Sequence, residues 1–71
     1  MEVLVEKLTE ILEVEALDVT KKFTDYDEWD SLSALSVIAM LDSDYNTTMK
    51  GNELTEFESI EAFCKEVLSR Q

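Results

Sequence analysis

The chain has no proline and no histidine, and it has one glycine and one cysteine among its 71 residues. So few turn-forming residues disfavour a collagenous chain, a flexible linker or a β fold with many turns. With Cys64 as the one thiol and no imidazole, the chain lacks the usual zinc ligands and cannot form an internal disulfide. No base is paired with a nucleophile in any recognisable pattern, so we expect a protein that is not an enzyme.

Positive charge is also scarce, because 6 lysines and arginines face 17 acidic residues and the formal net charge is −11. Such a surface repels phosphate backbones, which disfavours nucleic-acid binding, and it attracts basic patches on proteins. The N-terminal stretch MEVLVEKLTEIL carries acids among its apolar positions and predicts neither a signal peptide nor a membrane span. We expect residues 1–71 to form a single domain that is monomeric and cytoplasmic. Cys64 is expected to be buried as a free thiol.

The apolar residues, at 45% of the chain, are too many for simple disorder and follow a helical period. The first stretch predicts a helix at about residues 2–15, since it places apolar side chains on one face: Leu4, Leu8, Ile11 and Leu12. The last stretch has the clearest pattern, with Ser59 as its candidate N-cap and an apolar face formed by Ile60, Phe63, Cys64, Val67 and Leu68. Both patterns are typical of helices that cover a core.

Residues 31–44 predict a second long helix, with Asp30 as its N-cap. Its apolar stripe is wider than one core-facing side needs, so part of it either lies deep in the core or contacts something else. The segment ELTEF, residues 53–57, predicts a short additional helix. Residues 16–30 form a long connection that we expect to be held by its aromatic residues, and a connection of this length is often functional. The predicted fold is therefore all-α, a small bundle of three main helices and one short helix.

The segment EWDSLSAL places Ser31 at the boundary between a charged stretch and the second helix. If Asp30 caps the helix, Ser31 is its first residue and its hydroxyl faces solvent. The free backbone N–H groups and the positive end of the helix dipole favour a phosphate at this position. The plainer interpretation is that Asp-Ser is a common way to begin a helix and has no further role.

The longer segment EWDSLSALSVIAMLDSDY resembles the prosthetic-group segment of acyl carrier proteins, in which an Asp-Ser-Leu triplet opens the second helix. The resemblance covers the whole chain in length, acidity and helix order. It implies an acyl-carrier-like bundle in which Ser31, flanked by Asp30 and Leu32, carries 4′-phosphopantetheine. A phosphopantetheinyl transferase would attach this group, and enzymes with basic docking patches would then exchange acyl thioesters with it.

The resemblance also assigns roles to residues of the second half. It implies an acyl cleft, or else plain core packing, for Val37, Leu41, Met49 and Ile60, and it implies partner contacts for Leu35, Ala39, Asp42 and Asp44. Many fatty-acid carriers have Gly-Ala before the triplet and acids two and five residues after the serine. This chain has Glu28-Trp29 and the serines Ser33 and Ser36 there, which is more similar to stand-alone or specialised-pathway carriers. Fatty-acid, polyketide, peptide-type and cell-surface polymer pathways all remain open.

Residues 42–53, DSDYNTTMKGNE, allow a rival interpretation as an EF-hand calcium loop. Four residues match its ligand positions 1, 3, 5 and 12: Asp42, Asp44, Asn46 and Glu53. Against this, Thr47 occupies the place of the turn-forming glycine, Lys50 occupies position 9, and the chain has no second loop to complete a pair. The same acids could instead bind divalent ions weakly, and the chain could be a bare acidic interaction domain without a prosthetic group.

Overall fold

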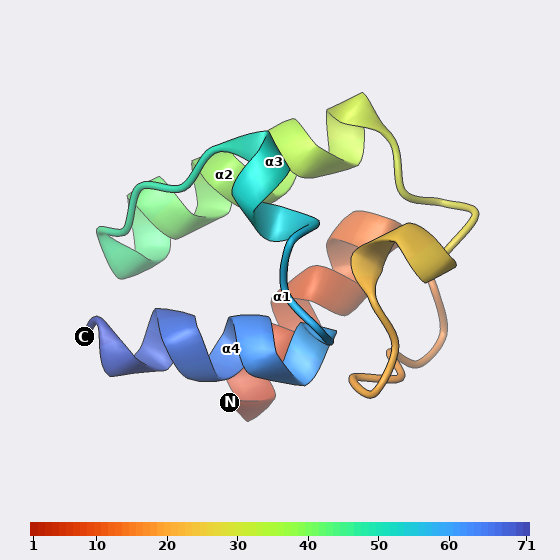
Figure 1. Ribbon diagram of the computed structural model, residues 1–71, viewed down its shortest axis with the longest axis horizontal. Helices are drawn as coiled ribbons and strands as arrows, with labels where there is room; N and C mark the ends of the chain where they lie inside the picture. The colour runs from red at the N-terminus through yellow and green to blue at the C-terminus, as the bar shows by residue number, and fades with distance from the viewer.

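The computed structural model describes all 71 residues, and its regular elements are all helices, without strands, which confirms the predicted fold class (Figure 1). The order along the chain is α1 (Glu2–Leu12), a turn of 3-10 helix (Phe23–Asp25), α2 (Ser31–Tyr45), α3 (Gly51–Leu54) and α4 (Ile60–Ser69). In Figure 1, α2 and α4 lie on opposite sides of the molecule, α1 passes behind α4, and the short α3 lies in front, between α2 and α4. No helix is long and apolar enough to cross a membrane.

The first helix is shorter than its apolar pattern predicts. It ends at Leu12 because Glu13 takes a left-handed backbone conformation, with φ 57°, and its N–H donates back to the Glu10 carbonyl. Val14 still packs against the core, so the apolar pattern continues past the point where the backbone turns away. The prediction of a helix to residue 15 was therefore too long by three residues.

The long connection after α1 is attached to α4 by its backbone. The N–H groups of Ile60 and Glu61 donate to the carbonyls of Lys21 and Val19, each at 2.8 Å. These two N–H groups belong to the first turn of α4, which has no partners for them within the helix. The connection thus provides hydrogen-bond acceptors for the free N–H groups at the N-terminus of α4. The same two bonds fix the position of the connection.

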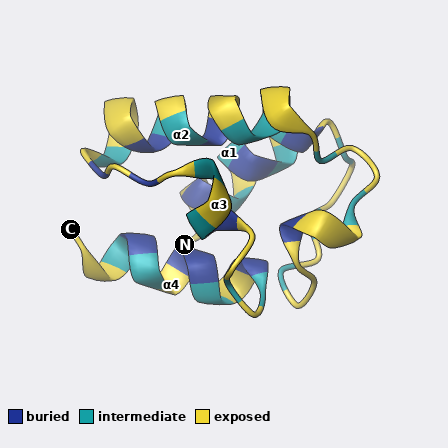
Figure 2. Ribbon diagram, turned by 45° about the horizontal axis from the view of Figure 1, so that its top comes forward, coloured by how far each residue is buried: buried dark blue, intermediate teal, exposed yellow.

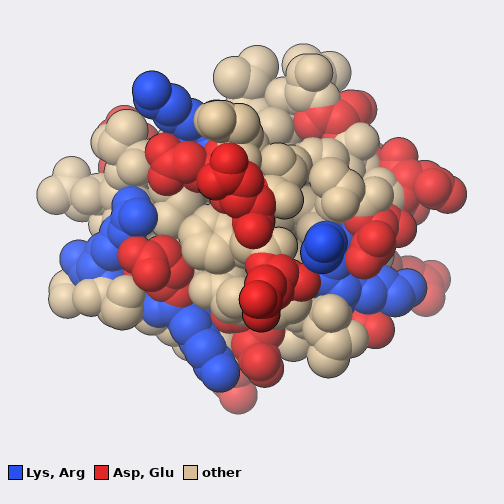
Figure 3. Space-filling view, in the orientation of Figure 1, with Lys and Arg blue, Asp and Glu red and all other residues tan.

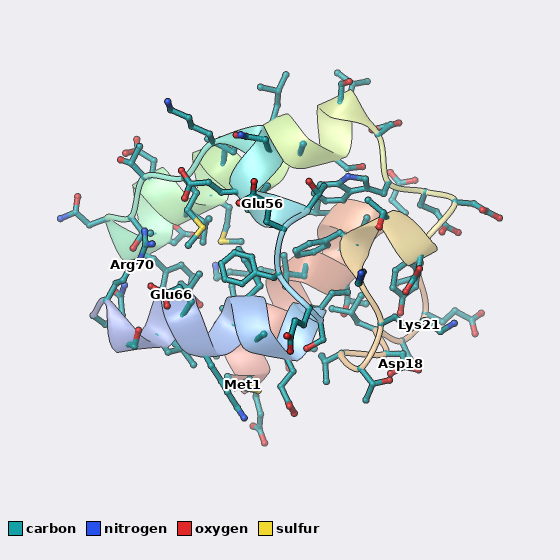
Figure 4. The ribbon with its side chains drawn as sticks, in the orientation of Figure 1. Met1, Asp18, Lys21, Glu56, Glu66 and Arg70 are labelled. Carbon is teal, nitrogen blue, oxygen red and sulfur yellow. The ribbon has the colours of Figure 1, made fainter.

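Side chains hold the same connection internally. The Tyr26 hydroxyl accepts the N–H of Asp18 at 2.7 Å, and Asp18 Oδ1 accepts the N–H of Thr20 at 3.0 Å. Lys21 lies near Asp18 in this loop (Figure 4), and its ammonium sits 5.7 Å from the centre of the Tyr26 ring. Phe23 is buried and adds the apolar anchor, so the expectation of a loop held by its aromatics is confirmed.

The third helix occupies residues 51–54 and not residues 53–57 as predicted. It begins where Glu53 Oε1 accepts the N–H of Lys50 at 3.4 Å, and it buries Leu54. The fourth helix begins as predicted, because the Ser59 hydroxyl accepts the N–H of Ala62 at 3.1 Å. Its end is stabilised by an ion pair between Glu66 and Arg70, whose side chains lie side by side in Figure 4.

The core lies between the helices and is drawn mainly from their inner faces (Figure 2). Twelve apolar residues are buried: Leu4, Leu8, Leu12, Phe23, Val37, Leu41, Met49, Leu54, Ile60, Phe63, Cys64 and Val67. Phe63 is at its centre and meets Phe23 and Phe57 edge to face, with ring centroids 5.1 and 5.6 Å apart. Every main helix contributes, so the fold depends on all of them packing at once.

Candidate functional site

The N-terminus of α2 is closed by the side chain of Asp30, as predicted. Asp30 has an extended backbone, and its Oδ1 accepts the N–H of Ser33 at 2.8 Å. This hydrogen bond lowers the pKa of the Asp30 carboxyl below its usual range, because accepting N–H donors favours the ionised form. Ser31 is the first residue of the helix and is exposed to solvent.

The segment that leads into Ser31 packs against the core. The Trp29 ring stacks on Phe23 at 4.6 Å, and Phe23 in turn meets Phe63 of α4. The Ser33 hydroxyl donates to the Glu28 carbonyl at 3.1 Å, which joins the first turn of α2 to the end of the loop. A flexible attachment at Ser31 would therefore start from a fixed point on the protein.

The Ser31 hydroxyl has no hydrogen-bond partner, and its place at the N-terminus of a helix favours a phosphate ester. None of the hydrogen bonds of the structure engages its hydroxyl, whereas the hydroxyls of Ser33 and Thr47 both donate to backbone carbonyls. The N–H groups of the first helical turn point outward at this end, and the aligned peptide dipoles of a 15-residue helix favour negative charge there. The residues present thus fit a phosphodiester on Ser31.

A surface cleft of about 390 Å³ lies beside Ser31, between the end of α1 and the start of α2. Its lining combines apolar side chains with carboxylates and hydroxyls: Ile11, Leu12, Glu13, Glu28, Asp30, Leu32, Ser33 and Ser36. The sequence did not reveal this cleft, because Glu13 comes beside the α2 N-terminus only through the left-handed turn that ends α1. That turn has no glycine to signal it.

The expected partner residues lie on the outward side of α2. Leu35 is 61% exposed and Ala39 is exposed, so neither is needed to complete the core. Asp42 and Asp44 are also exposed, but Asp44 Oδ2 accepts from Lys7 Nζ at 2.9 Å and joins α2 to α1. This ion pair raises the pKa of Lys7, mainly through the hydrogen bond, and no feature of the sequence predicted it.

The four residues expected to line an acyl cleft come together in the core. Val37 and Leu41 of α2, Met49 of the following segment and Ile60 of α4 are all buried, with at most 2% of any side chain exposed. No cavity of the structure is lined by them. An acyl chain would enter here only if α2 and α4 moved apart.

The EF-hand interpretation receives no support. Asp42 and Asp44 belong to α2, so they are held on a helix and do not begin a loop around a common centre. Asp44 is bonded to Lys7, and Glu53 caps α3 through the Lys50 N–H. Nowhere does the structure gather three or more His, Cys, Asp or Glu residues in an arrangement able to hold a metal ion.

Cys64 is fully buried on the inner face of α4. Burial raises the pKa of its thiol to about 11, and the charge of Glu61 acts in the same direction. The thiolate is the reactive form of cysteine, so Cys64 is held in its unreactive state near neutral pH.

A comparison with protein families matches residues 2–67 to the family described as "Phosphopantetheine attachment site". A search of curated proteins and a search of solved structures each gave no match. The matched residues cover nearly the whole chain, and the all-helical fold agrees with this family. The chain belongs to this family of phosphopantetheine-binding carrier domains, the acyl carrier protein family, whose prosthetic group is 4′-phosphopantetheine.

Proposed function

We propose that the protein is an acyl carrier protein whose 4′-phosphopantetheine is attached to Ser31. The observation that carries this proposal is the position of one hydroxyl, exposed and free of hydrogen bonds at the first residue of α2. The prosthetic group supplies a terminal thiol that holds acyl groups as thioesters, which activates them for transfer. The chain's own residues fix the attachment point and offer a docking surface around it.

Asp30 and Leu32 support Ser31 in different ways. Asp30 accepts the Ser33 N–H and so holds the first turn of α2 in its helical form, which keeps the positive end of the helix dipole beside Ser31. Leu32 is 73% exposed and stands beside the hydroxyl, where an enzyme acting on Ser31 would contact it. We assign both residues to recognition and positioning at the attachment site.

The partners follow from the carrier role. A phosphopantetheinyl transferase must bring coenzyme A to Ser31, and acyl-handling enzymes must then reach the same place. Leu35 and Ala39 are suited to such contacts, and Asp42 lies farther along the same side of α2. Tethering keeps the acyl group at a high effective concentration near each docked enzyme, while weak contacts let the carrier leave again.

The acyl chain, where one is carried, is proposed to enter the core between α2 and α4. Val37, Leu41, Met49 and Ile60 all belong to the buried apolar cluster of the core. A domain of this size has modest stability, so a partial separation of its helices is energetically accessible. A long acyl chain would then raise the thermal midpoint, whereas an acetyl group would leave it unchanged.

The attachment is tested by mass spectrometry. The apo chain is incubated with coenzyme A and a promiscuous phosphopantetheinyl transferase, and we expect it to gain the mass of one phosphopantetheine. Ser31→Ala should gain none, and Ser43→Ala, which removes an exposed hydroxyl of α2 away from the cleft, should gain the same mass as wild type. A wild-type chain that stays unmodified with several transferases would refute the proposal.

A further inference from the structure

The first half of α1 and the loop that follows this helix form an apolar groove on the surface. Its volume is about 470 Å³, and it is lined by Met1, Glu2, Val5, Glu6, Leu17 and Val19, which we call the α1 groove. None of these residues lines the cleft beside Ser31. The N-terminus of α1 and the start of α2 lie on opposite sides of the molecule in Figure 1, so the groove and the attachment site are separate surfaces.

The fold holds the floor of the α1 groove in place without covering it. Val5, Leu17 and Val19 are half-buried and pack against the core, so the floor is continuous with the interior of the protein. The position of Val19 is fixed by its carbonyl, which accepts the N–H of Glu61 in α4 at 2.8 Å. A binding partner would therefore meet an apolar surface that is already formed, which lowers the ordering cost of association.

Two carboxylates at the rim of the groove have no cationic partner within the protein. Glu2 and Glu6 are exposed and lie one turn apart on α1. The three ion pairs of the structure all join other residues. Like charges at this spacing on a helix repel each other, and a cation placed between them would relieve the repulsion. The α1 groove thus combines an apolar floor with a negative rim that is not neutralised.

The charge of the chain decides which kind of partner fits. The net charge is −11, and acids are spread over much of the face seen in Figure 3, so nucleic acids, anionic membranes and a second copy of the chain are all repelled. The groove is instead complementary to an amphipathic helix with a large apolar residue and, one turn away, a lysine or arginine. Its volume lies in the range of pockets that hold small ligands, which is ample for one apolar side chain.

We propose that the α1 groove binds a basic amphipathic helix of a partner protein and so anchors the carrier while Ser31 stays accessible. This inference rests on the proposed function only for the carrier role, because the groove itself does not include Ser31. The apolar contact supplies affinity at any ionic strength, and the two carboxylates orient the helix and supply the part that salt weakens. A carrier anchored in this way stays at a high effective concentration near every enzyme held on the same partner.

The groove is tested with a fluorescein-labelled amphipathic helical peptide of leucine, lysine and alanine, about 15 residues long. Fluorescence anisotropy should show that the apo chain binds it, and NMR should place the largest amide shift changes in residues 1–6 and 17–19. A second peptide, in which alanine replaces each leucine, keeps every lysine and should bind at least about tenfold more weakly. Binding that ignores the leucines, or shift changes confined to α2, would overturn the inference.

The apolar floor is tested by Val5→Thr. This change replaces one methyl group of the groove with a hydroxyl, and we expect it to weaken peptide binding about fourfold. The matched control is Val3→Thr, the same change on the same helix at a residue that is 59% exposed and does not line the groove. The control should bind like wild type, and circular dichroism checks that both variants are folded. Equal affinities of the two variants would refute the apolar contact.

The negative rim is tested by Glu2→Gln with Glu6→Gln. This double variant should bind the peptide about fivefold more weakly at about 20 mM NaCl and nearly as well as wild type at about 300 mM NaCl. The control for charge is Asp42→Asn with Glu56→Gln, which removes two exposed acids outside the groove. In Figure 4, Glu56 lies well away from Met1. A control that weakens binding equally would show that the peptide follows the net charge and not the groove.

Loading of Ser31 separates this inference from the proposed function. A promiscuous phosphopantetheinyl transferase should load the wild type with the same kcat/KM in the presence and absence of saturating peptide. Loading that falls in proportion to the bound peptide would refute an anchor separate from the attachment site. A wild type that never loads but binds the peptide in the groove would refute the attachment at Ser31 and keep the groove as a protein-binding site. A dimer that light scattering detects and that Val5→Thr dissociates would overturn the choice of partner and assign the groove to a second copy.

Discussion

The two helices α2 and α4 begin in the same way and then differ. Each has an oxygen-bearing N-cap, Asp30 or Ser59, that accepts the N–H three residues later. After its cap, α4 turns apolar residues inward and carries acids and a lysine outside, as a helix that only covers a core should. After its cap, α2 is apolar on both sides and exposes Leu32 and Leu35. Packing explains the placement of apolar residues in α4 but only those on the inner side of α2. The apolar residues on its outer side lie close to Ser31.

The largest effect that tests this comparison is a core substitution in α4. Phe63→Ala should lower the free energy of unfolding by about 3–5 kcal/mol, because it opens a cavity at the centre of the aromatic cluster. Leu35→Ala, on the exposed side of α2, should change it by less than about 0.5 kcal/mol. Circular dichroism at 222 nm follows both variants: the value for Leu35→Ala comes from its urea transition, and that for Phe63→Ala from the fraction that stays folded in buffer.

A domain of this size has little stability to lose, so Phe63→Ala is expected to be largely unfolded in buffer. Phe63→Leu keeps most of the volume and should remain folded, with a loss of about 1 kcal/mol. If Leu35→Ala were as destabilising as either Phe63 variant, the exposed leucine would be part of the fold after all, and the contrast between the helices would disappear.

The same contrast explains what the sequence could predict. Periodicity located α4, the inner side of α2 and both caps, because burial and capping leave regular spacing in a sequence. It placed the end of α1 three residues too late, because the left-handed turn at Glu13 interrupts a pattern that still contributes Val14 to the core. The short α3 was misplaced because one turn of helix has too few residues to show a period.

The site was predictable only in part for a related reason. Ser31 was found because a local cap, a triplet and a helix start lie next to one another in the chain. The cleft beside it joins α1, the loop and α2, and the Lys7–Asp44 pair spans 37 residues. Such contacts are set by how helices pack, and a single sequence carries no local signal for them.

A smaller effect concerns the two caps, beginning with Ser59. Ser59→Ala removes the acceptor of the Ala62 N–H and should cost about 1 kcal/mol of folding free energy. The loop carbonyls of Lys21 and Val19 still satisfy the first two N–H groups of α4, so the helix should shorten little. Urea denaturation gives the free energy, and hydrogen exchange should show faster exchange at Ala62 alone. Loss of protection throughout α4 would show that the cap, and not the loop, holds this end.

The smallest effect distinguishes the caps by pH, because Asp30 titrates and Ser59 does not. The folded-state pKa of Asp30 is lowered by the Ser33 N–H, so the stability that its ionised form contributes is present above the unfolded pKa, about 4, and is lost as the pH falls through the folded value. Asp30→Asn keeps an acceptor without a titrating charge. The difference in unfolding free energy between wild type and Asp30→Asn should therefore shrink as the pH falls below about 4. The corresponding difference between wild type and Ser59→Ala should stay constant over the same range. Because each variant is compared with wild type at the same pH, the general effect of protonating the other carboxylates cancels. Parallel curves for the two pairs would mean that the charge of Asp30 contributes nothing to the stability of the start of α2. The position of Ser31 would then depend on Trp29 and the loop alone.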